Sequence, residues 1–136
     1  MEDPLASLPG YALRRAANAM MAELGRRLEA LDLRISEATL LLMVAERRDM
    51  TASRIGGLLD IQRANMVPLI NRLESAGLIE RRPLDRKSSA GVLTPRGLEV
   101  RAQAEALTAR FEADLMARIP AEHRDHLLPA LSALWP

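Results

Sequence analysis

The chain of 136 residues contains no cysteine and only one Trp, one Tyr and one Phe. Without cysteine there is no disulfide framework, no cysteine-ligated zinc site and no sensing through the chain's own thiols. No apolar run approaches the roughly 18 residues of a membrane-spanning helix. The acidic beginning, Met1 to Pro4, lacks the basic and apolar pattern of a secretion signal. We therefore expect one soluble, cytoplasmic domain.

Charges of opposite sign nearly cancel over the chain, but they are unevenly distributed. The 19 basic and 18 acidic side chains leave a formal net charge of +1. Residues 47–96 carry ten basic and five acidic side chains, a net charge of +5, and the remainder has a net charge of −4. A basic segment between acidic flanks either binds an anionic partner or is a solvated surface with clustered cations. Charge alone leaves both readings open.

Apolar residues recur at helical spacing before the basic segment. They predict one helix that begins near Pro9 and ends near residues 31–33. A second helix is expected to begin at Ser36, whose hydroxyl is a good N-cap, and to end near residues 47–49. Both helices have an apolar face, so we expect them to contribute to the core.

A long helix is predicted after the basic segment. Thr94 followed by Pro95 is a strong helix start, and Pro120 ends the periodic pattern. A shorter helical segment follows, with Pro129 bending or dividing it. The long helix also carries a strip of small residues that would let another helix approach closely, namely Ala102, Ala106, Ala109 and Ala113.

The basic segment itself reads as two short helices followed by a hairpin. The first helix covers residues 51–59, and the second begins near residues 62–65 and ends before Gly77. Pro68 is expected in the first turns of that second helix, without a break. Residues 78–82 and 91–93 then predict two short strands, joined by a basic tip at residues 85–89.

This order of elements is that of a winged helix-turn-helix with helical extensions. The fold class is therefore mainly α with a small β-hairpin wing. In such a unit the second helix of the pair enters the DNA major groove, where Gln62, Arg63 and Asn65 can bind base edges. Arg54 and Arg72 are expected near phosphates. The basic tip, Arg86 and Lys87, is expected in the minor groove or on the backbone.

Several short sequence motifs occur in a specific order and at specific spacings. They are Thr51-Ala-Ser-Arg-Ile-Gly-Gly-Leu-Leu59, Asn71-Arg-Leu-Glu-Ser-Ala-Gly-Leu-Ile79, Arg81-Arg82, Asp85-Arg86-Lys87 and Leu93-Thr-Pro-Arg-Gly97. From Ser36 to Gly97 the chain therefore resembles the multiple antibiotic resistance regulator (MarR) family. The flanking helices resemble the family more loosely.

The resemblance implies a homodimer that binds a pseudo-palindromic operator in double-stranded DNA, and a repressor released by a small-molecule ligand. It divides residues 1–136, one MarR-like domain, into a dimerisation region at 9–33 and 98–136 and a DNA-binding region at 36–97. No cofactor is expected. The expected DNA-binding residues are Thr51, Arg54, Gln62, Arg63, Asn65, Arg72, Arg81, Arg82, Arg86, Lys87 and Ser88.

The ligand and its site are less well defined by the sequence. A ligand wedged between the first and the long helix would change the separation of the two recognition helices in a dimer. The ligand is expected to be an aromatic acid or an acyl thioester. Family clefts receive polar groups from the first helix, although Arg14 and Arg15 also suit dimer salt bridges, and methionines suit core packing. The candidate ligand residues are Tyr11, Arg14, Arg15, Asn18 and Met43.

Two residues depart from the family pattern. Lys87 stands where the wing usually has Arg, and a lysine cannot replace the planar fork of a guanidinium. Gly56 stands where the family usually has Ala, at a helical position where glycine costs about 1 kcal/mol. The first departure leaves open whether Arg86 takes over minor-groove binding.

The sequence gives less support to functions other than DNA binding. His123 and His126 are three residues apart, but without two further ligands we expect surface or dimer contacts and no metal site. An enzyme is not expected, because the sequence lacks a catalytic triad pattern and a phosphate-binding loop. The alternative is a winged helix that binds a protein partner. That alternative predicts an apolar recognition face, where this chain has Gln62, Arg63 and Asn65.

Overall fold

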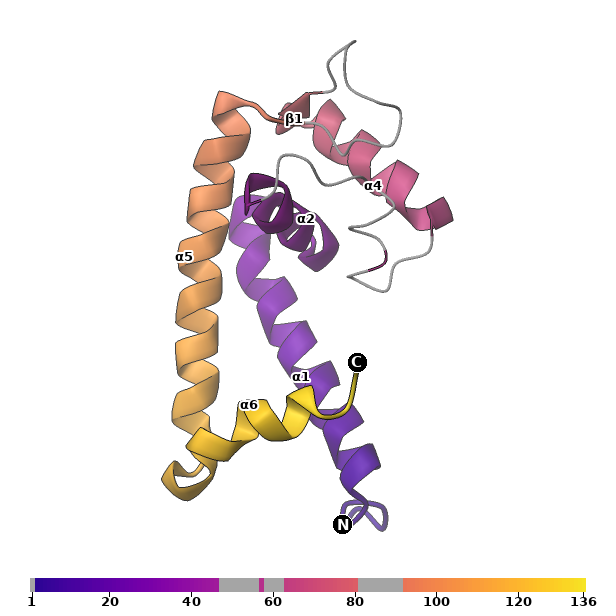
Figure 1. The fold of residues 1–136 in the computed structure, drawn as a ribbon, viewed down its shortest axis with the longest axis vertical. Coiled ribbons are helices and arrows are strands. Elements are labelled where there is room, and N and C mark those ends of the chain that lie inside the picture. Colours follow the sequence, from indigo (N-terminus) through magenta and orange to yellow (C-terminus); the bar gives the residue numbers. More distant parts are fainter. Residues whose placement is uncertain (1, 47–56, 58–62, 81–91) are drawn as a thin grey trace.

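The structure, a computed structural model, describes residues 2–46, 57, 63–80 and 92–136. Its frame is formed by two long helices, α1 (Pro9–Leu28) and α5 (Pro95–Arg118), which pack along each other (Figure 1). A short 3-10 helix, η1 (Glu29–Leu31), continues α1. Helix α2 (Ile35–Glu46) follows and packs against both long helices.

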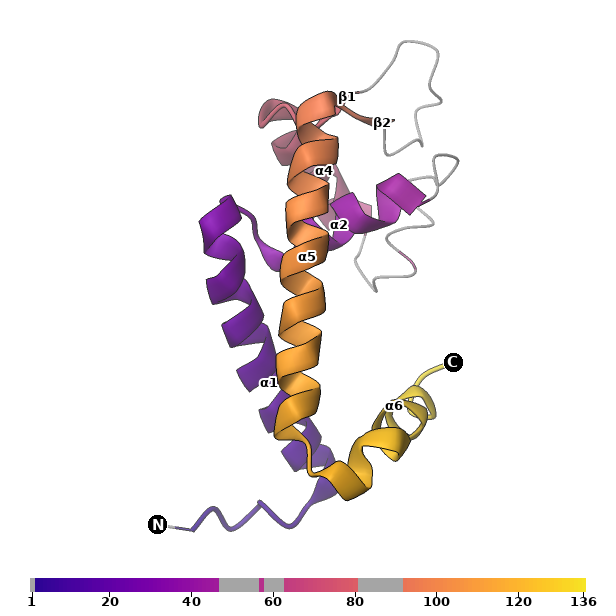
Figure 2. The same ribbon diagram turned by 90° about the vertical axis from the view of Figure 1, so that its left-hand side faces the viewer.

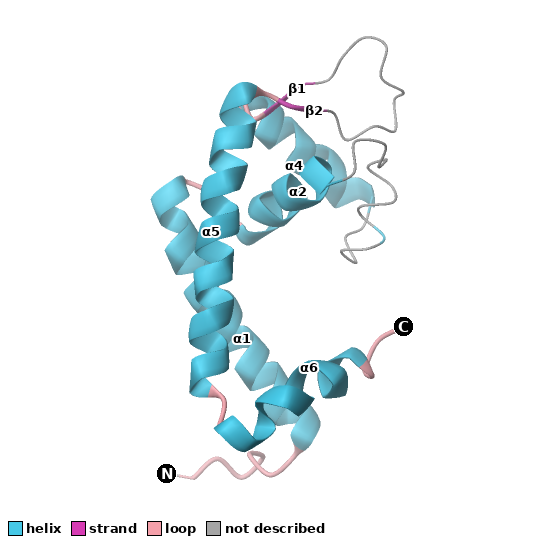
Figure 3. Ribbon diagram, turned by 60° about the vertical axis from the view of Figure 1, so that its left-hand side comes forward, coloured by secondary structure: helices cyan, strands magenta, loops and turns pink. Residues whose placement is uncertain are grey.

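Helix α4 and a small hairpin lie at the end of the molecule where α5 begins (Figure 2). Helix α4 (Arg63–Ser75) leads through Gly77 into strand β1 (Ile79–Glu80), which pairs antiparallel with β2 (Val92–Leu93). Ile79 is opposite Leu93, and Glu80 is opposite Val92. At the other end of α5, η2 (Ala121–His123) and α6 (Arg124–Ser132) turn back across the molecule (Figure 3).

A single hydrophobic core joins α4 and β1 to the frame of α1, α2 and α5. Burial of such side chains is worth about 1.5–3 kcal/mol each, so α4 is firmly held on the frame. The largest fully buried side chains are Leu28, Leu40, Leu41, Met66, Leu69, Ile70, Leu73 and Ile79.

The described elements confirm the predicted fold class and the order of its parts. Thr94 caps α5, as predicted: its Oγ1 accepts a 2.9 Å hydrogen bond from the amide of Gly97. The predicted cap at Ser36 was wrong, because α2 begins at Ile35 and Ser36 lies inside it. The carboxylate of Glu37 takes the capping role, since it accepts a 2.8 Å hydrogen bond from the amide of Arg34.

Helix α4 begins at Arg63, within the predicted range, and continues through Pro68 without a break. A proline is tolerated most easily among the first four amides, which have no partner within a helix, but Pro68 is the sixth residue of the described helix and lies beyond them. The two residues that follow Pro68, Leu69 and Ile70, are buried in the core. The predicted helix 51–59 and the hairpin tip 85–89 lie outside the described residues, apart from Gly57, which is helical.

Helix α5 has two opposite apolar faces. Val100, Ala104, Leu107 and Phe111 face the core of the protomer. On the opposite side Leu98 is 55% exposed, and the predicted strip of small residues follows it along the helix, all exposed: Ala102, Ala106, Ala109 and Ala113.

Among the described residues, no helix combines the length and apolarity that crossing a membrane requires.

Candidate functional site

Helix α4 is anchored on one face and exposed on the other. Met66, Leu69, Ile70 and Leu73 recur at three- and four-residue steps and are buried against the frame. The opposite face is exposed, and Val67 there is 53% exposed. A rigidly seated helix with a free face, next to a hairpin, has the geometry needed to enter a DNA groove.

Two predicted DNA-binding side chains of α4 can be placed. Asn65 and Arg72 are exposed and lie on one flank of the helix, where they line a hollow together with Ser36 of α2. The backbone of Arg63 forms the first turn of α4. The remaining predicted DNA-binding positions, and the side chain of Arg63, lie outside the described residues: Thr51, Arg54, Gln62, Arg81, Arg82, Arg86, Lys87 and Ser88.

Arg72 has an acidic neighbour that sequence reasoning did not pair with it. Its Nε lies 3.8 Å from Oε2 of Glu37 on α2, while Oε1 of the same carboxylate holds the amide of Arg34. The side chain of Glu37 is only 12% exposed, and that of Arg72 is 42% exposed. Arg72 therefore links α4 to the first turn of α2.

The junction between the hairpin and α5 is held by a chain of backbone contacts. The hydroxyl of Thr94 donates a 2.6 Å hydrogen bond to the carbonyl of Gly77, directly after α4. The amide of Thr94 donates to the carbonyl of Leu78. Gly97 packs so closely on Leu78 that a Cβ atom there would overlap the Leu78 carbonyl. The end of α4 and the start of α5 are therefore fixed to each other.

A groove of about 890 Å³ lies between α1 and α2. Its lining is mostly apolar, with two cations, Arg26 and Arg34, and one anion, Glu29. None of the ligand residues predicted from the sequence lines this groove. Gly25 lines the groove from α1, and a Cβ atom added there would meet Ile35 only at ordinary contact distance, so this glycine did not mark the site. The lining residues are Met21, Ala22, Gly25, Arg26, Glu29, Leu33, Arg34, Ile35, Ser36 and Thr39.

The five predicted ligand residues lie elsewhere in the described part of the chain. Met43 packs against the hydrophobic core. Asn18 and Arg14 are exposed on α1, and the guanidinium of Arg14 lies 5.5 Å from the centre of the Tyr11 ring. None of these residues lines the α1–α2 groove, and neither does α5. The structure thus does not bring the predicted set together at that groove.

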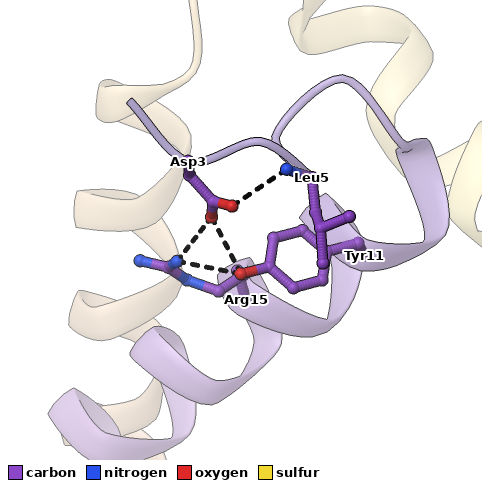
Figure 4. Close-up of polar contacts among 4 residues, drawn as sticks. All are labelled: Asp3, Leu5, Tyr11 and Arg15. Atoms are coloured by element: carbon purple, nitrogen blue, oxygen red, sulfur yellow. Dashed lines mark hydrogen bonds and ion pairs between the residues drawn. The ribbon is translucent and has the colours of Figure 1, made fainter. Parts of the chain in front are cut away.

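Tyr11 and Arg15 instead hold the N-terminal segment (Figure 4). One oxygen of Asp3 accepts hydrogen bonds from the Tyr11 hydroxyl at 2.8 Å and from Arg15 at 2.9 Å, and the other accepts one from the amide of Leu5. The hydrogen bond from Leu5 and that from Tyr11 lower the pKa of the Asp3 carboxyl, with a smaller contribution from the charge of Arg15. This cluster orders residues that precede α1.

A second charged cluster joins α1 to α5. The guanidinium of Arg27 lies 2.8 Å from Asp114 and 3.1 Å from Glu23, and it sits 5.4 Å from the centre of the Phe111 ring. Asp114 and Glu23 raise the pKa of Arg27 through these hydrogen bonds. Arg118 also approaches Glu23, at 3.6 Å. The two long helices are therefore linked by charge as well as by apolar packing.

No group of three or more metal-ligating side chains occurs among the residues that the structure places. His123 lies 3.8 Å from Glu122, and both side chains are largely exposed.

Comparisons with known proteins point in one direction. The model of the MarR family matches residues 33–89. The structure of a transcriptional repressor, CouR, is 30% identical, has a TM-score of 0.84, and the match covers 96% of this chain and 93% of that chain. Two further CouR structures also have TM-scores of 0.84.

The first of these two, CouR bound to a 23-mer DNA duplex, is 29% identical over 98% of this chain and 99% of that chain. The second, CouR bound to p-coumaroyl-CoA, is 27% identical over 98% of this chain and 96% of that chain. A comparison with curated protein sequences finds no match.

Proposed function

The chain belongs to the MarR family, and from this premise we propose that it is a dimeric, sequence-specific DNA-binding transcriptional regulator. We propose further that it is a repressor and that a small molecule releases it from its operator. The observation that carries the proposal is the seating of α4. Its apolar face is buried in the core and its other face is free beside the hairpin.

The charge distribution supports binding to DNA. Residues 47–96, which include α4 and both strands, have a net charge of +5, although the whole chain has a net charge of only +1. Lys and Arg side chains that neutralise phosphates supply most of the sequence-independent affinity for DNA. The resemblance of the chain to CouR, which has been seen bound to a DNA duplex, also supports this assignment.

The exposed apolar surface supports a homodimer. The strip that begins at Leu98 and continues through the four alanines leaves a smooth face on α5 for a second helix. At the far end of the molecule, α6 buries none of its residues within the described part of the chain. Leu128, Leu134 and Trp135 are each more than 60% exposed. Such surface is unusual for a monomer, and a second copy of the chain would cover it.

The α1–α2 groove is the better candidate for the ligand. It combines an apolar lining with Arg26, Arg34 and Glu29. The two cations outnumber the one carboxylate, which suits a molecule with an apolar or aromatic body and an anionic group. The aromatic acyl thioester bound to CouR is of this class. We therefore propose an aromatic acid or acyl thioester as the effector, bound in this groove and not at the five residues expected from the sequence.

Selection from a pool of random DNA duplexes tests the proposed function. A dimer whose recognition helices enter successive major grooves should select an inverted repeat with half-sites about 10 bp apart. Selection of unrelated sequences would contradict sequence-specific binding. We expect the protein to be located in the cytoplasm, together with the DNA. We also expect it to have no catalytic activity.

The alternative, a winged helix that binds a protein partner, is less well supported. The flank of α4 that can be described carries the polar side chains of Asn65 and Arg72, and protein interfaces usually have an apolar centre. A protein that fails to select any duplex, but remains folded and dimeric, would favour this alternative.

A further inference from the structure

The first turn of α2 lies between the α1–α2 groove and the hollows that line α4. Arg34 lines both the groove and a hollow beside Arg72, while Ser36 lines both the groove and a hollow beside Asn65. Residues 33–37, which span about one helical turn, therefore form a wall between the groove and the two hollows beside α4. A ligand in the groove would touch one side of this wall, and the hollows beside Asn65 and Arg72 of α4 lie on the other.

Glu37 connects the two sides of this wall. Its Oε1 accepts the amide hydrogen bond of Arg34, and its Oε2 lies 3.8 Å from Nε of Arg72. The carboxylate is thus fixed to the backbone of a groove residue and also faces a cation of the recognition helix. A shift of Arg34 therefore moves the partner of Arg72.

We propose that Glu37 and Arg72 form the positioning link through which occupation of the α1–α2 groove changes the orientation of α4. The proposal rests on the proposed function, in which the response to the ligand is release from DNA. The link between Glu37 and Arg72 is itself a property of the free protein. Glu37 is acidic and its side chain is only 12% exposed, so a role of this residue in the response cannot come from a phosphate contact. Arg72, by contrast, was predicted from the sequence as a phosphate contact.

A side chain built into the groove tests the link without knowledge of the effector. Ala22 is exposed and lines the groove, so Ala22→Trp places a large apolar group there. Ala19→Trp is the matched control, because Ala19 is exposed on the same helix and does not line the groove. The hydrogen-exchange rates of the α4 amides are then compared between proteins that have the Glu37–Arg72 pair and proteins that lack it.

Two substitutions remove the link with little change in shape. Glu37→Gln keeps an oxygen for the amide of Arg34 and removes only the charge, and Arg72→Gln removes the cation. Arg72→Lys restores a charge at the same position, and a merely structural role would not need this rescue. Glu74→Gln is the charge-matched control, since Glu74 is exposed on α4.

The expected result is that Ala22→Trp changes exchange rates along α4 by about fivefold or more, the lower end of common allosteric couplings. The change should be lost in the Glu37→Gln and Arg72→Gln backgrounds and kept with Arg72→Lys and Glu74→Gln. An equal change in every background, or no change with the Glu37–Arg72 pair intact, would overturn the proposal. Because exchange needs no DNA, failure of the protein to select a duplex would instead count against the proposed function.

Discussion

The hydroxyl of Thr94 and the carbonyl of Gly77 are joined by a hydrogen bond of 2.6 Å. The two residues are 17 positions apart, with the hairpin between them. The same hydroxyl accepts from the amide of Gly97, so one side chain ties the end of α4 to the start of α5. Movements of the long helix are therefore expected to reach the recognition helix directly.

Removal of this hydroxyl should destabilise the protein. Thr94→Val keeps the shape of the side chain but loses both hydrogen bonds, and loss of such a cap costs about 0.5–2 kcal/mol. Thr94→Ser retains the hydroxyl, so its free energy of unfolding should lie within a few tenths of a kcal/mol of that of the parent protein. Urea unfolding, followed by circular dichroism, gives the difference, and equal midpoints for Val and Ser would show that the bonds contribute little.

Gly97 should be intolerant of even one added methyl group. A Cβ atom at this position would overlap the backbone of Leu78, which cannot move aside as a flexible side chain can. We expect Gly97→Ala to lower the free energy of unfolding by about 1–3 kcal/mol, as overpacking does. Gly10→Ala is the control, because nothing lies within 4 Å of its added Cβ. If Gly97→Ala were as stable as Gly10→Ala and the parent protein, α5 would not lie as close to Leu78 as the structure places it.

A charge in the small-residue strip of α5 should break the proposed dimer. Ala106→Glu places an ionised group on the face opposite the core, where burial without a partner is costly. Gln103→Glu adds the same charge at an exposed position outside the strip. Sedimentation analysis should show monomers for Ala106→Glu and dimers for the control. If both variants were dimeric, the dimer interface would lie elsewhere on the molecule.

The two classes of predicted DNA contact should respond differently to substitution. Arg63→Ala should lower the discrimination between the selected duplex and its single-base variants, because a base-reading arginine contributes about 1–3 kcal/mol. Arg81→Ala should weaken binding to all duplexes alike, as loss of a phosphate contact does. Competition titrations with matched and altered duplexes measure both effects, and the reverse outcome would exchange the two roles.

Local sequence patterns were sufficient for most of the fold. Thr94 and Pro95 marked the start of α5 because a cap and a first-turn proline act within a few residues. The start of α2 was missed for a related reason. Ser36 is a good cap by type, but the carboxylate of Glu37 reaches the Arg34 amide, and the helix begins one residue before Ser36.

The candidate ligand site was much harder to predict than the helices. The groove is formed by residues of α1 and α2 that no shared periodicity or motif connects, such as Gly25 and Ile35. The pairing of Arg72 with Glu37 also depends on how α4 packs against α2. Sequence periodicity identifies the buried face of each helix, but not which exposed flanks the packing brings together.

The proposed function is tested most directly by the affinity of the protein for its selected duplex at increasing salt concentration. Binding through the basic segment should release counterions, and roughly six or more phosphate contacts would give a slope of log K against log salt of about −5 or steeper. A scrambled duplex should bind more weakly at every salt concentration. An affinity that stays constant from low to physiological salt, or that is equal for the two duplexes, would contradict a sequence-specific DNA-binding regulator.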